Sequence, residues 1–213
     1  MPAYSSWQSA NAQVFWTEVA RFDHIVQVYE NDGILIDAVT GFVESAIHSN
    51  ENAVIVARHR YLNALEDRLE SYGLNIEKLI SQHKFIPLNV EEVVAEFIIN
   101  GQVDEDNMNK ALSGVLVNAG SNGKKFRMFG EMSTYLFEQG HHEAAIKLER
   151  SGNDFCRTYP GLVYCAYPKK LFSGVLADYS IPVCCAHTKM ISGSEKQLTH
   201  VHYRSIHHHH HAN

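Results

Sequence analysis

Residues 124–132, KKFRMFGEM, decide the fold class that the sequence predicts. The run from Phe126 to Phe129 is typical of a buried strand, and it leads through Gly130 and Glu131 directly into a helical pattern. A strand followed at once by a helix is the repeating unit of a parallel sheet wrapped by helices. Ligands of such sheets bind beyond the carboxyl ends of the strands. Glu131 is therefore at a position where a ligand is expected.

The same alternation extends in both directions from this stretch. We predict an α/β fold in which a mainly parallel sheet forms the middle of three layers and helices flank it. Pro87 lacks an N–H donor, which predicts that it lies near a sheet edge or a strand end. The predicted strands are 24–30, 53–58, 84–89, 125–131, 161–168 and 181–187, and the predicted helices are 34–49, 60–73, 90–101, 104–120, 132–140 and 141–155.

Composition limits the class of protein. The chain has 213 residues, 45% of them hydrophobic, which suits one domain with a substantial core. Its net charge of −6 argues against direct nucleic-acid binding. No apolar run reaches the ~20 residues of a membrane span, and no secretory signal is recognisable. The four cysteines form no Cys-x-x-Cys pair, so we expect reduced thiols and a cytoplasmic location.

The domain organisation follows from where the pattern begins and ends. We expect an N-terminal extension over residues 1–20, one domain over 21–190, and a polar, His-rich tail over 191–213. The run His207–His211 is interpreted as a purification tag or part of a disordered tail.

A phosphate-binding loop is not recognisable. Residues 120–125, GSNGKK, precede a strand instead of following one, and they lack the Gly-Lys-Ser/Thr ending. The first strand leads into YENDGILIDAV, which contains one glycine, Gly33, and no lysine. Other catalytic motifs, such as Gly-x-Ser-x-Gly and His-Glu-x-x-His, are also missing. We therefore expect a protein that is not an enzyme and that needs no cofactor.

Two groups of side chains leave alternatives open. Glu131 is either a ligand-binding group or general base, or a structural residue that caps the next helix or pairs with Arg58 or Arg127. Cys165, Cys184, Cys185 and His187 would converge if strands 161–168 and 181–187 were neighbours, and such groups suit zinc or copper. Free cysteines are more often small buried hydrophobes, so we predict no metal site.

Five segments together resemble a known family. They are HIVQVYEND, AVIVARHRYLNALEDRLESYGLNIE, FRMFGEM, AAIKLERSGND, and LVYCAYP followed by CCAH. In this order they resemble the MEDS domain, the sensory domain named for methanogens, methylotrophs and the dichloromethane-responsive repressor DcmR. The resemblance covers residues 22 to about 190.

The resemblance implies a RecA/KaiC-like core without a phosphate loop and a role in sensing small hydrocarbon derivatives. It also implies an output through a histidine kinase or a transcription regulator. The positions that match those characteristic of the family are His24, Tyr29, Gly130, Glu131, Glu149, Asn153, Cys165, Tyr167 and His187.

The combined prediction is a non-catalytic sensory domain that binds a small organic ligand and signals through a partner protein. Two other functions stay open: a degenerate RecA-type nucleotide-binding enzyme that uses Glu131, and a structural interaction module, for example a homodimer. The residues predicted to bind the ligand are His24, Tyr29, Arg58, Glu131, Cys165, Tyr167 and His187.

Overall fold

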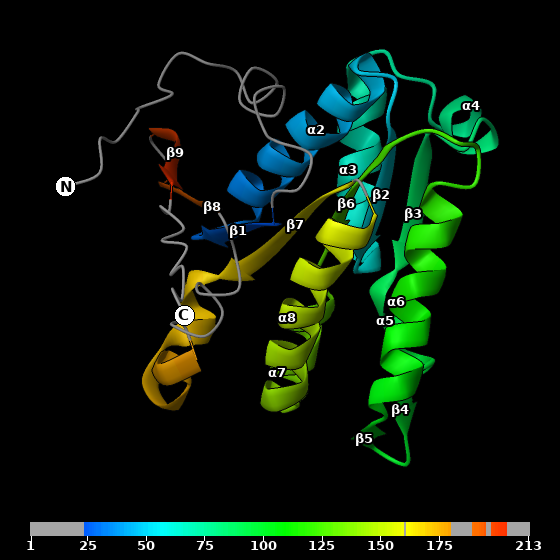
Figure 1. Cartoon of the computed structure of the whole chain (residues 1–213). Coiled ribbons are helices and arrows are strands. Elements are labelled where there is room, and N and C mark those ends of the chain that lie inside the picture. Colours follow the sequence, from blue (N-terminus) through cyan, green and yellow to red (C-terminus); the bar gives the residue numbers. More distant parts are fainter. Residues whose placement is uncertain (1–23, 160, 180–188, 195–196, 204–213) are drawn as a thin grey trace, which may run out of the picture.

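The structure, a computed structural model, describes residues 24–159, 161–179, 189–194 and 197–203. Strands and helices alternate along the chain (Figure 1). The strands are β1 (His24–Tyr29), β2 (Asn52–Ala57), β3 (Phe85–Asn89), β4 (Ile98–Ile99), β5 (Gln102–Val103), β6 (Phe126–Gly130), β7 (Gly161–Pro168), β8 (Lys189–Ser194) and β9 (Gln197–Tyr203). The helices are α2 (Asp32–His48), α3 (His59–Ser71), α4 (Ile76–Ser81), α5 (Val90–Ala95), α6 (Glu105–Ala119), α7 (Met132–Glu138), α8 (His142–Thr158) and the 3₁₀ helices η1 (Lys169–Phe172) and η2 (Gly174–Tyr179).

The main sheet has seven strands in the order β3-β2-β6-β7-β1-β8-β9. All neighbouring pairs are parallel except β8 and β9. Strand β3 lies at an edge, as its proline predicts, because a proline cannot donate to a second neighbouring strand.

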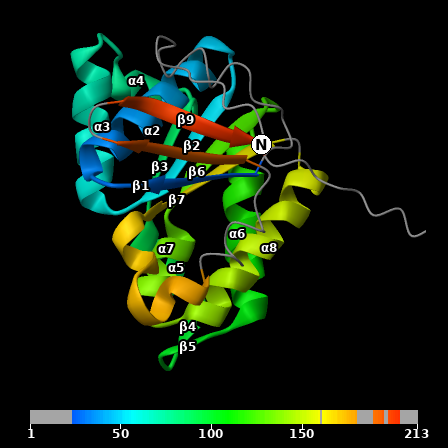
Figure 2. The same ribbon diagram turned by 90° about the vertical axis from the view of Figure 1, so that its left-hand side faces the viewer.

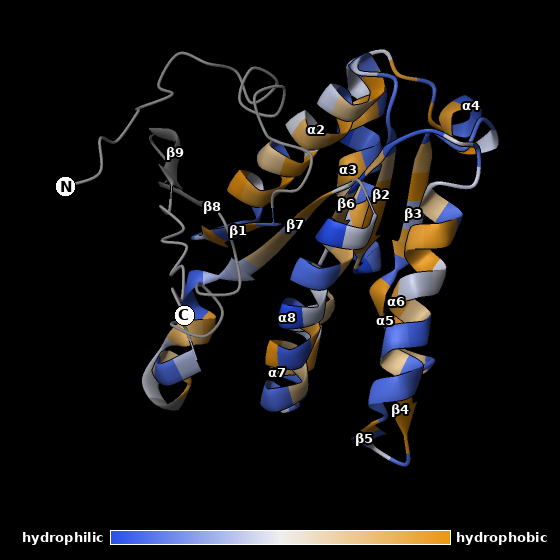
Figure 3. Cartoon of the chain, in the orientation of Figure 1, coloured by the Kyte–Doolittle hydropathy of each residue, from blue (hydrophilic) through white to orange (hydrophobic). Residues whose placement is uncertain are grey.

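Two hydrophobic cores cover the two faces of the sheet, which makes the three predicted layers (Figure 2). Helices α2, α3 and α4 pack on one face, and α5, α6, α7 and α8 pack on the other. Strands β2, β3, β6 and β7 carry mostly hydrophobic residues and the helices carry both kinds, as expected for helices with one face toward solvent (Figure 3). Side chains alternate along each strand, so neighbouring residues of β1 and β7 belong to different cores.

The predicted helix over 90–101 is wrong in its second half. Helix α5 ends at Ala95, and the chain then forms the hairpin of β4 and β5. Asn100 and Gly101, between these strands, have φ of 51° and 74°. Asn-Gly favours the turn that needs positive φ at both positions, so the dipeptide specifies a hairpin here and not a helix end.

Three further expectations have different outcomes. The predicted tail begins at residue 191, and this range includes β9 and most of β8. The prediction of a tail is therefore wrong for the residues of these strands. The predicted strand 181–187 lies outside the described residues. Helix α4 was not predicted; Asn75 caps it by accepting from the N–H of Lys78 at 3.0 Å. None of the helices within the described ranges is both long and apolar enough to cross a bilayer.

Candidate functional site

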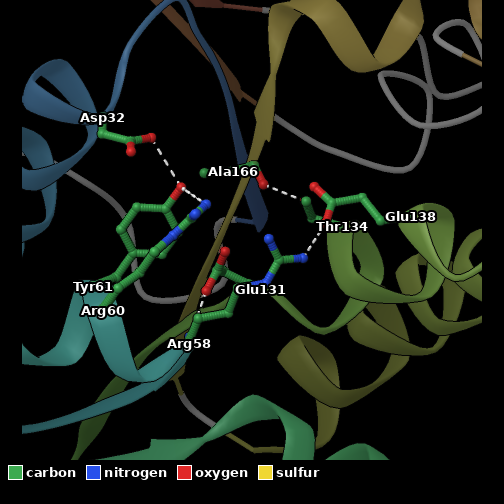
Figure 4. Close-up of polar contacts among 8 residues, drawn as sticks. All are labelled: Asp32, Arg58, Arg60, Tyr61, Glu131, Thr134, Glu138 and Ala166. Atoms are coloured by element: carbon green, nitrogen blue, oxygen red, sulfur yellow. Dashed lines mark hydrogen bonds and ion pairs between the residues drawn. The ribbon is translucent and has the colours of Figure 1, made fainter.

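Glu131 follows β6 and lies at the carboxyl ends of the central strands (Figure 4). Its Oε2 accepts a hydrogen bond from the backbone N–H of Arg58, which follows β2, at 2.6 Å. The residue is 2% exposed, and its Oε1 has no hydrogen-bond partner among the residues that the structure describes. One oxygen of this carboxyl group is thus held by the backbone and the other is uncommitted.

Burial changes the acid strength of this carboxyl group. Desolvation raises the pKa of Glu131 to about 7, and the Arg58 N–H and guanidinium offset only part of that effect. A carboxylic acid with this pKa is partly protonated at neutral pH. It can then donate a hydrogen bond as well as accept one.

The polar groups around Glu131 are largely paired with one another. The guanidinium of Arg58 forms an ion pair with Glu138 and lies 5.5 Å from the ring centroid of Tyr135. The Tyr61 hydroxyl accepts from Arg60 and donates to Asp32, both at 2.9 Å (Figure 4). We call Tyr29, Asp32, Arg58, Tyr61 and Glu131 the strand-end cluster.

Tyr29 ends β1 and is 4% exposed within this cluster. Burial, a hydrogen bond with Tyr61 and the nearby Glu131 carboxylate all raise the pKa of the Tyr29 hydroxyl far above its usual range. Tyr29 therefore stays neutral and acts only as a hydrogen-bonding group.

The turn between β1 and α2 is where a phosphate loop would lie in a nucleotide-binding sheet. Here Asn31 caps α2 by accepting from the N–H of Ile34 at 3.0 Å, and Asp32 occupies the first turn. A side-chain cap and a carboxylate occupy the helix end that would otherwise attract a phosphate. The turn is unsuited to a triphosphate.

A second group of polar side chains lies under α8, on the face of the sheet that this helix covers. His24 Nδ1 is 2.9 Å from Asn153 Oδ1, and His24 Nε2 is 3.2 Å from Glu149 Oε2 and 3.5 Å from Cys165 Sγ. The Tyr167 hydroxyl donates to Glu149 Oε1. We call His24, Glu149, Asn153, Cys165 and Tyr167 the buried cluster, because His24, Glu149 and Tyr167 are at most 1% exposed.

Helix α8 approaches β1 closely because residue 152 is a glycine. A Cβ atom at Gly152 would lie 3.0 Å from His24 Cε1 and 3.2 Å from its Nε2. Such a contact is tighter than van der Waals packing allows without movement. The absence of a side chain at Gly152 thus lets the imidazole lie directly against the helix.

An apolar cavity adjoins the buried cluster. It offers about 30 Å³ to the centre of a water-sized molecule, which is roughly the room for two water molecules. His24, Glu149 and Cys165 form its polar side. The remaining lining residues are Leu112, Leu116, Met128, Gly130, Met132, Ser133, Leu148, Gly152, Phe155 and Val163.

The structure distributes the predicted ligand-binding residues over two places. Tyr29, Arg58 and Glu131 belong to the strand-end cluster, and His24, Cys165 and Tyr167 belong to the buried cluster. His187 lies outside the described residues, as do Cys184 and Cys185. The neighbours of β7 are β6 and β1, so the imidazole that meets Cys165 is that of His24.

Some residues of both clusters were missing from the predicted ligand set. Glu149 and Asn153 entered only through the family resemblance, although a spacing of four residues on a helix places them on one face. Asp32 and Tyr61 were not predicted to belong to a site. The one sequence signal for Asp32 is its position just after the first predicted strand. The alternative ion pair of Glu131 with Arg127 does not form, because Arg127 pairs with Glu51.

Two solved structures from Pyrococcus horikoshii OT3 resemble this fold. The KaiC-like protein PH0186 is 16% identical, with a TM-score of 0.54 over 88% of this chain and 80% of that one. The protein PH0250 is 8% identical, with a TM-score of 0.54 over 87% of this chain and 89% of that one. At these identities the likeness shows the fold alone, a KaiC-like arrangement of the RecA class.

A search of curated proteins finds no match to this chain. A family model does match, over residues 23–188, which include both clusters and most of the main sheet. The chain therefore belongs to the MEDS family, the methanogen/methylotroph, DcmR sensory domain.

Proposed function

We propose that this chain is a non-catalytic sensor whose ligand is a small, largely apolar organic molecule bound in the cavity beside the buried cluster. The observation that carries the proposal is the position of His24, Glu149 and Cys165 on the wall of an otherwise apolar cavity. An apolar wall supplies affinity, and a few polar groups fix the orientation of the ligand.

The size of the cavity limits the ligand. A volume of about 30 Å³ suits a molecule of few heavy atoms. Met128 and Met132 line the cavity, and methionine side chains adapt more readily than branched ones to a larger guest. We therefore expect one- to three-carbon derivatives, such as halogenated methanes and short alcohols, to bind better than longer chains.

The test is a calorimetric titration of such compounds into the wild-type chain and two variants of α6. Leu116→Phe fills the cavity, and we expect binding to weaken about tenfold or more, equivalent to about 1.4 kcal/mol. Val117→Phe changes a neighbouring side chain that is 60% exposed, and it should bind like the wild type. Equal binding by both variants would place the ligand elsewhere.

The proposal also includes an output through a partner, either a histidine kinase or a transcription regulator. A ligand changes an output only if the two conformations of the sensor bind it with different affinity. The expected result is that the affinity of the chain for such a purified partner changes when the ligand is added. An unchanged affinity would contradict the output part of the proposal while leaving ligand binding intact.

Absence of catalysis is part of the proposal. The cap by Asn31 and the charge of Asp32 support it, because both oppose phosphate binding at α2. The alternative, a degenerate nucleotide enzyme, predicts magnesium-dependent ATP turnover that Glu131→Gln abolishes. Such turnover would overturn the non-catalytic assignment.

A further inference from the structure

The buried cluster brings together three side chains of metal-binding type from three separate elements. His24 comes from β1, Glu149 from α8 and Cys165 from β7. One ligand atom of each lies within 4.8 Å of those of the other two. The three residues are far apart in sequence, so only the folded chain assembles the set.

Two of the three distances between the ligand atoms match those that a tetrahedral metal ion imposes, and the third lies within 4.8 Å. With Zn–N, Zn–O and Zn–S bonds of ordinary length, a tetrahedral ion holds nitrogen and oxygen about 3.3 Å apart and nitrogen and sulfur about 3.5 Å apart. His24 Nε2 lies 3.2 Å from Glu149 Oε2 and 3.5 Å from Cys165 Sγ. The site is close to ligand geometry without any rearrangement of His24 relative to the other two.

The residues behind the ligands orient them as metal sites require. Asn153 Oδ1 lies 2.9 Å from His24 Nδ1, so it can accept a hydrogen bond from a protonated Nδ1. The lone pair of Nε2 then faces Glu149 and Cys165. The Tyr167 hydroxyl holds the other oxygen of Glu149. An acceptor at Nδ1 raises the basicity of Nε2, and both contacts fix the directions of the ligand atoms.

Charge and softness indicate the type of ion. A carboxylate and a thiolate together neutralise a divalent cation, which suits a site with apolar walls. Thiolate and imidazole favour zinc and similar transition metals over magnesium or calcium. Three protein ligands leave a fourth position, and the same three residues border the cavity. Metal sites with three protein ligands keep this position for water or another molecule.

We propose that His24 Nε2, Glu149 Oε2 and Cys165 Sγ bind one zinc-class divalent metal ion, with Asn153 and Tyr167 orienting the ligands and the fourth position open to the cavity. No spacing in the sequence is diagnostic of such a site, and we predicted no metal site from it. The proposal does not depend on the identity of the organic ligand, because the metal alone tests it.

The experiment titrates Co²⁺ into the full chain and follows the sulfur-to-cobalt charge-transfer band in the near ultraviolet. Histidines of residues 207–211 bind cobalt without producing this band, because the band requires a thiolate ligand. We expect one equivalent per chain in the wild type and in Cys184→Ser/Cys185→Ser, and loss of the band in Cys165→Ser. Asn153→Ala should weaken the cobalt affinity of the site that produces this band about tenfold.

Two results would overturn the proposal. One is the absence of a charge-transfer band in the folded wild type, which would mean that the three groups share a proton and bind no metal. The other is a band that persists in Cys165→Ser. If Cys165→Ser does not fold, zinc protection of the wild type from a thiol reagent replaces it. Zinc should then protect the peptide that contains Cys165, and equal labelling with and without zinc would contradict the site.

Discussion

The strand-end cluster lies beyond the carboxyl ends of the strands, the buried cluster lies under α8 on one face of the sheet, and the two bring together different kinds of side chain. In the strand-end cluster, Arg58 pairs with Glu138, and Tyr61 joins Arg60 to Asp32. In the buried cluster, a carboxylate, a thiol and an imidazole converge on one point beside a cavity. Most groups of the first cluster are paired with one another, and three groups of the second also border a cavity.

The two clusters differ in their surroundings. The carboxyl ends of the strands carry polar residues, and most of these residues bind one another. The cavity lies under α8, with His24, Glu149 and Cys165 on its wall. Measurements that compare the two clusters therefore test the proposed function.

The largest expected effect concerns Glu131 and pH. Its pKa in the folded chain, about 7, lies above the ordinary value of 4.5. The folded state therefore binds the proton more tightly, and its contribution to stability is full below pH 4.5 and is lost as the pH rises through 7. Glu131→Gln removes this loss, so its free energy of unfolding relative to wild type should rise by about 3 kcal/mol across this window.

Chemical denaturation of both proteins at several pH values measures this difference. Glu70→Gln changes an exposed carboxylate and serves as the control, with an expected effect within about 0.5 kcal/mol. A pH-independent difference for Glu131→Gln would show that this carboxyl group titrates normally and that the strand-end cluster is solvated.

The second prediction makes the same change in each cluster. Tyr167→Phe removes a fully buried hydroxyl that donates to the Glu149 carboxylate, and we expect a loss of about 2 kcal/mol in unfolding free energy. Tyr61→Phe removes a less buried hydroxyl, with an expected loss of about 1 kcal/mol. Urea unfolding measures both. A larger loss for Tyr61→Phe would show that the hydroxyl in the strand-end cluster contributes more to stability than the hydroxyl in the buried cluster, which contradicts the prediction.

The third prediction compares two glycines within helices. Gly152→Ala places a methyl group 3.0 Å from His24, and crowding should outweigh the gain in helix propensity, for a net loss of about 1 kcal/mol. Gly114→Ala on α6 meets nothing within 4 Å and should gain up to about 1 kcal/mol. Thermal unfolding distinguishes the two. Equal stabilisation by both would mean that α8 can shift away from His24.

Much of the fold was predictable because hydrophobic patterns are local. The buried runs of β2, β6 and β7 and the helices between them were predicted, as was the edge position of Pro87. The hairpin at Asn100 and Gly101 was missed, because Gly101 was interpreted as a helix stop and the Asn-Gly turn was not considered. Strands β8 and β9 were missed because their residues are too polar to indicate burial.

The ligand-binding residues remain a prediction, and the structure divides the described ones between two clusters. The seven predicted residues were treated as one site. Strand geometry separates at least two of them, since His24 and Tyr29 are five positions apart on β1 and an odd separation places side chains on opposite faces. The partners of Cys165 were not predictable, because strand order decides which strand lies beside β7, and local sequence does not encode strand order.

By itself the sequence determined an alternating α/β chain, the loss of a phosphate loop and the family resemblance, because these depend on residue types and on spacings within one element. Only the tertiary structure decided that His24, Glu149 and Cys165 meet beside a cavity while Glu131 lies in a separate, mostly paired cluster. The physical reason is that β1 lies next to β7 and α8 packs across both, which is a choice of strand order and close packing at Gly152 that no local pattern specifies.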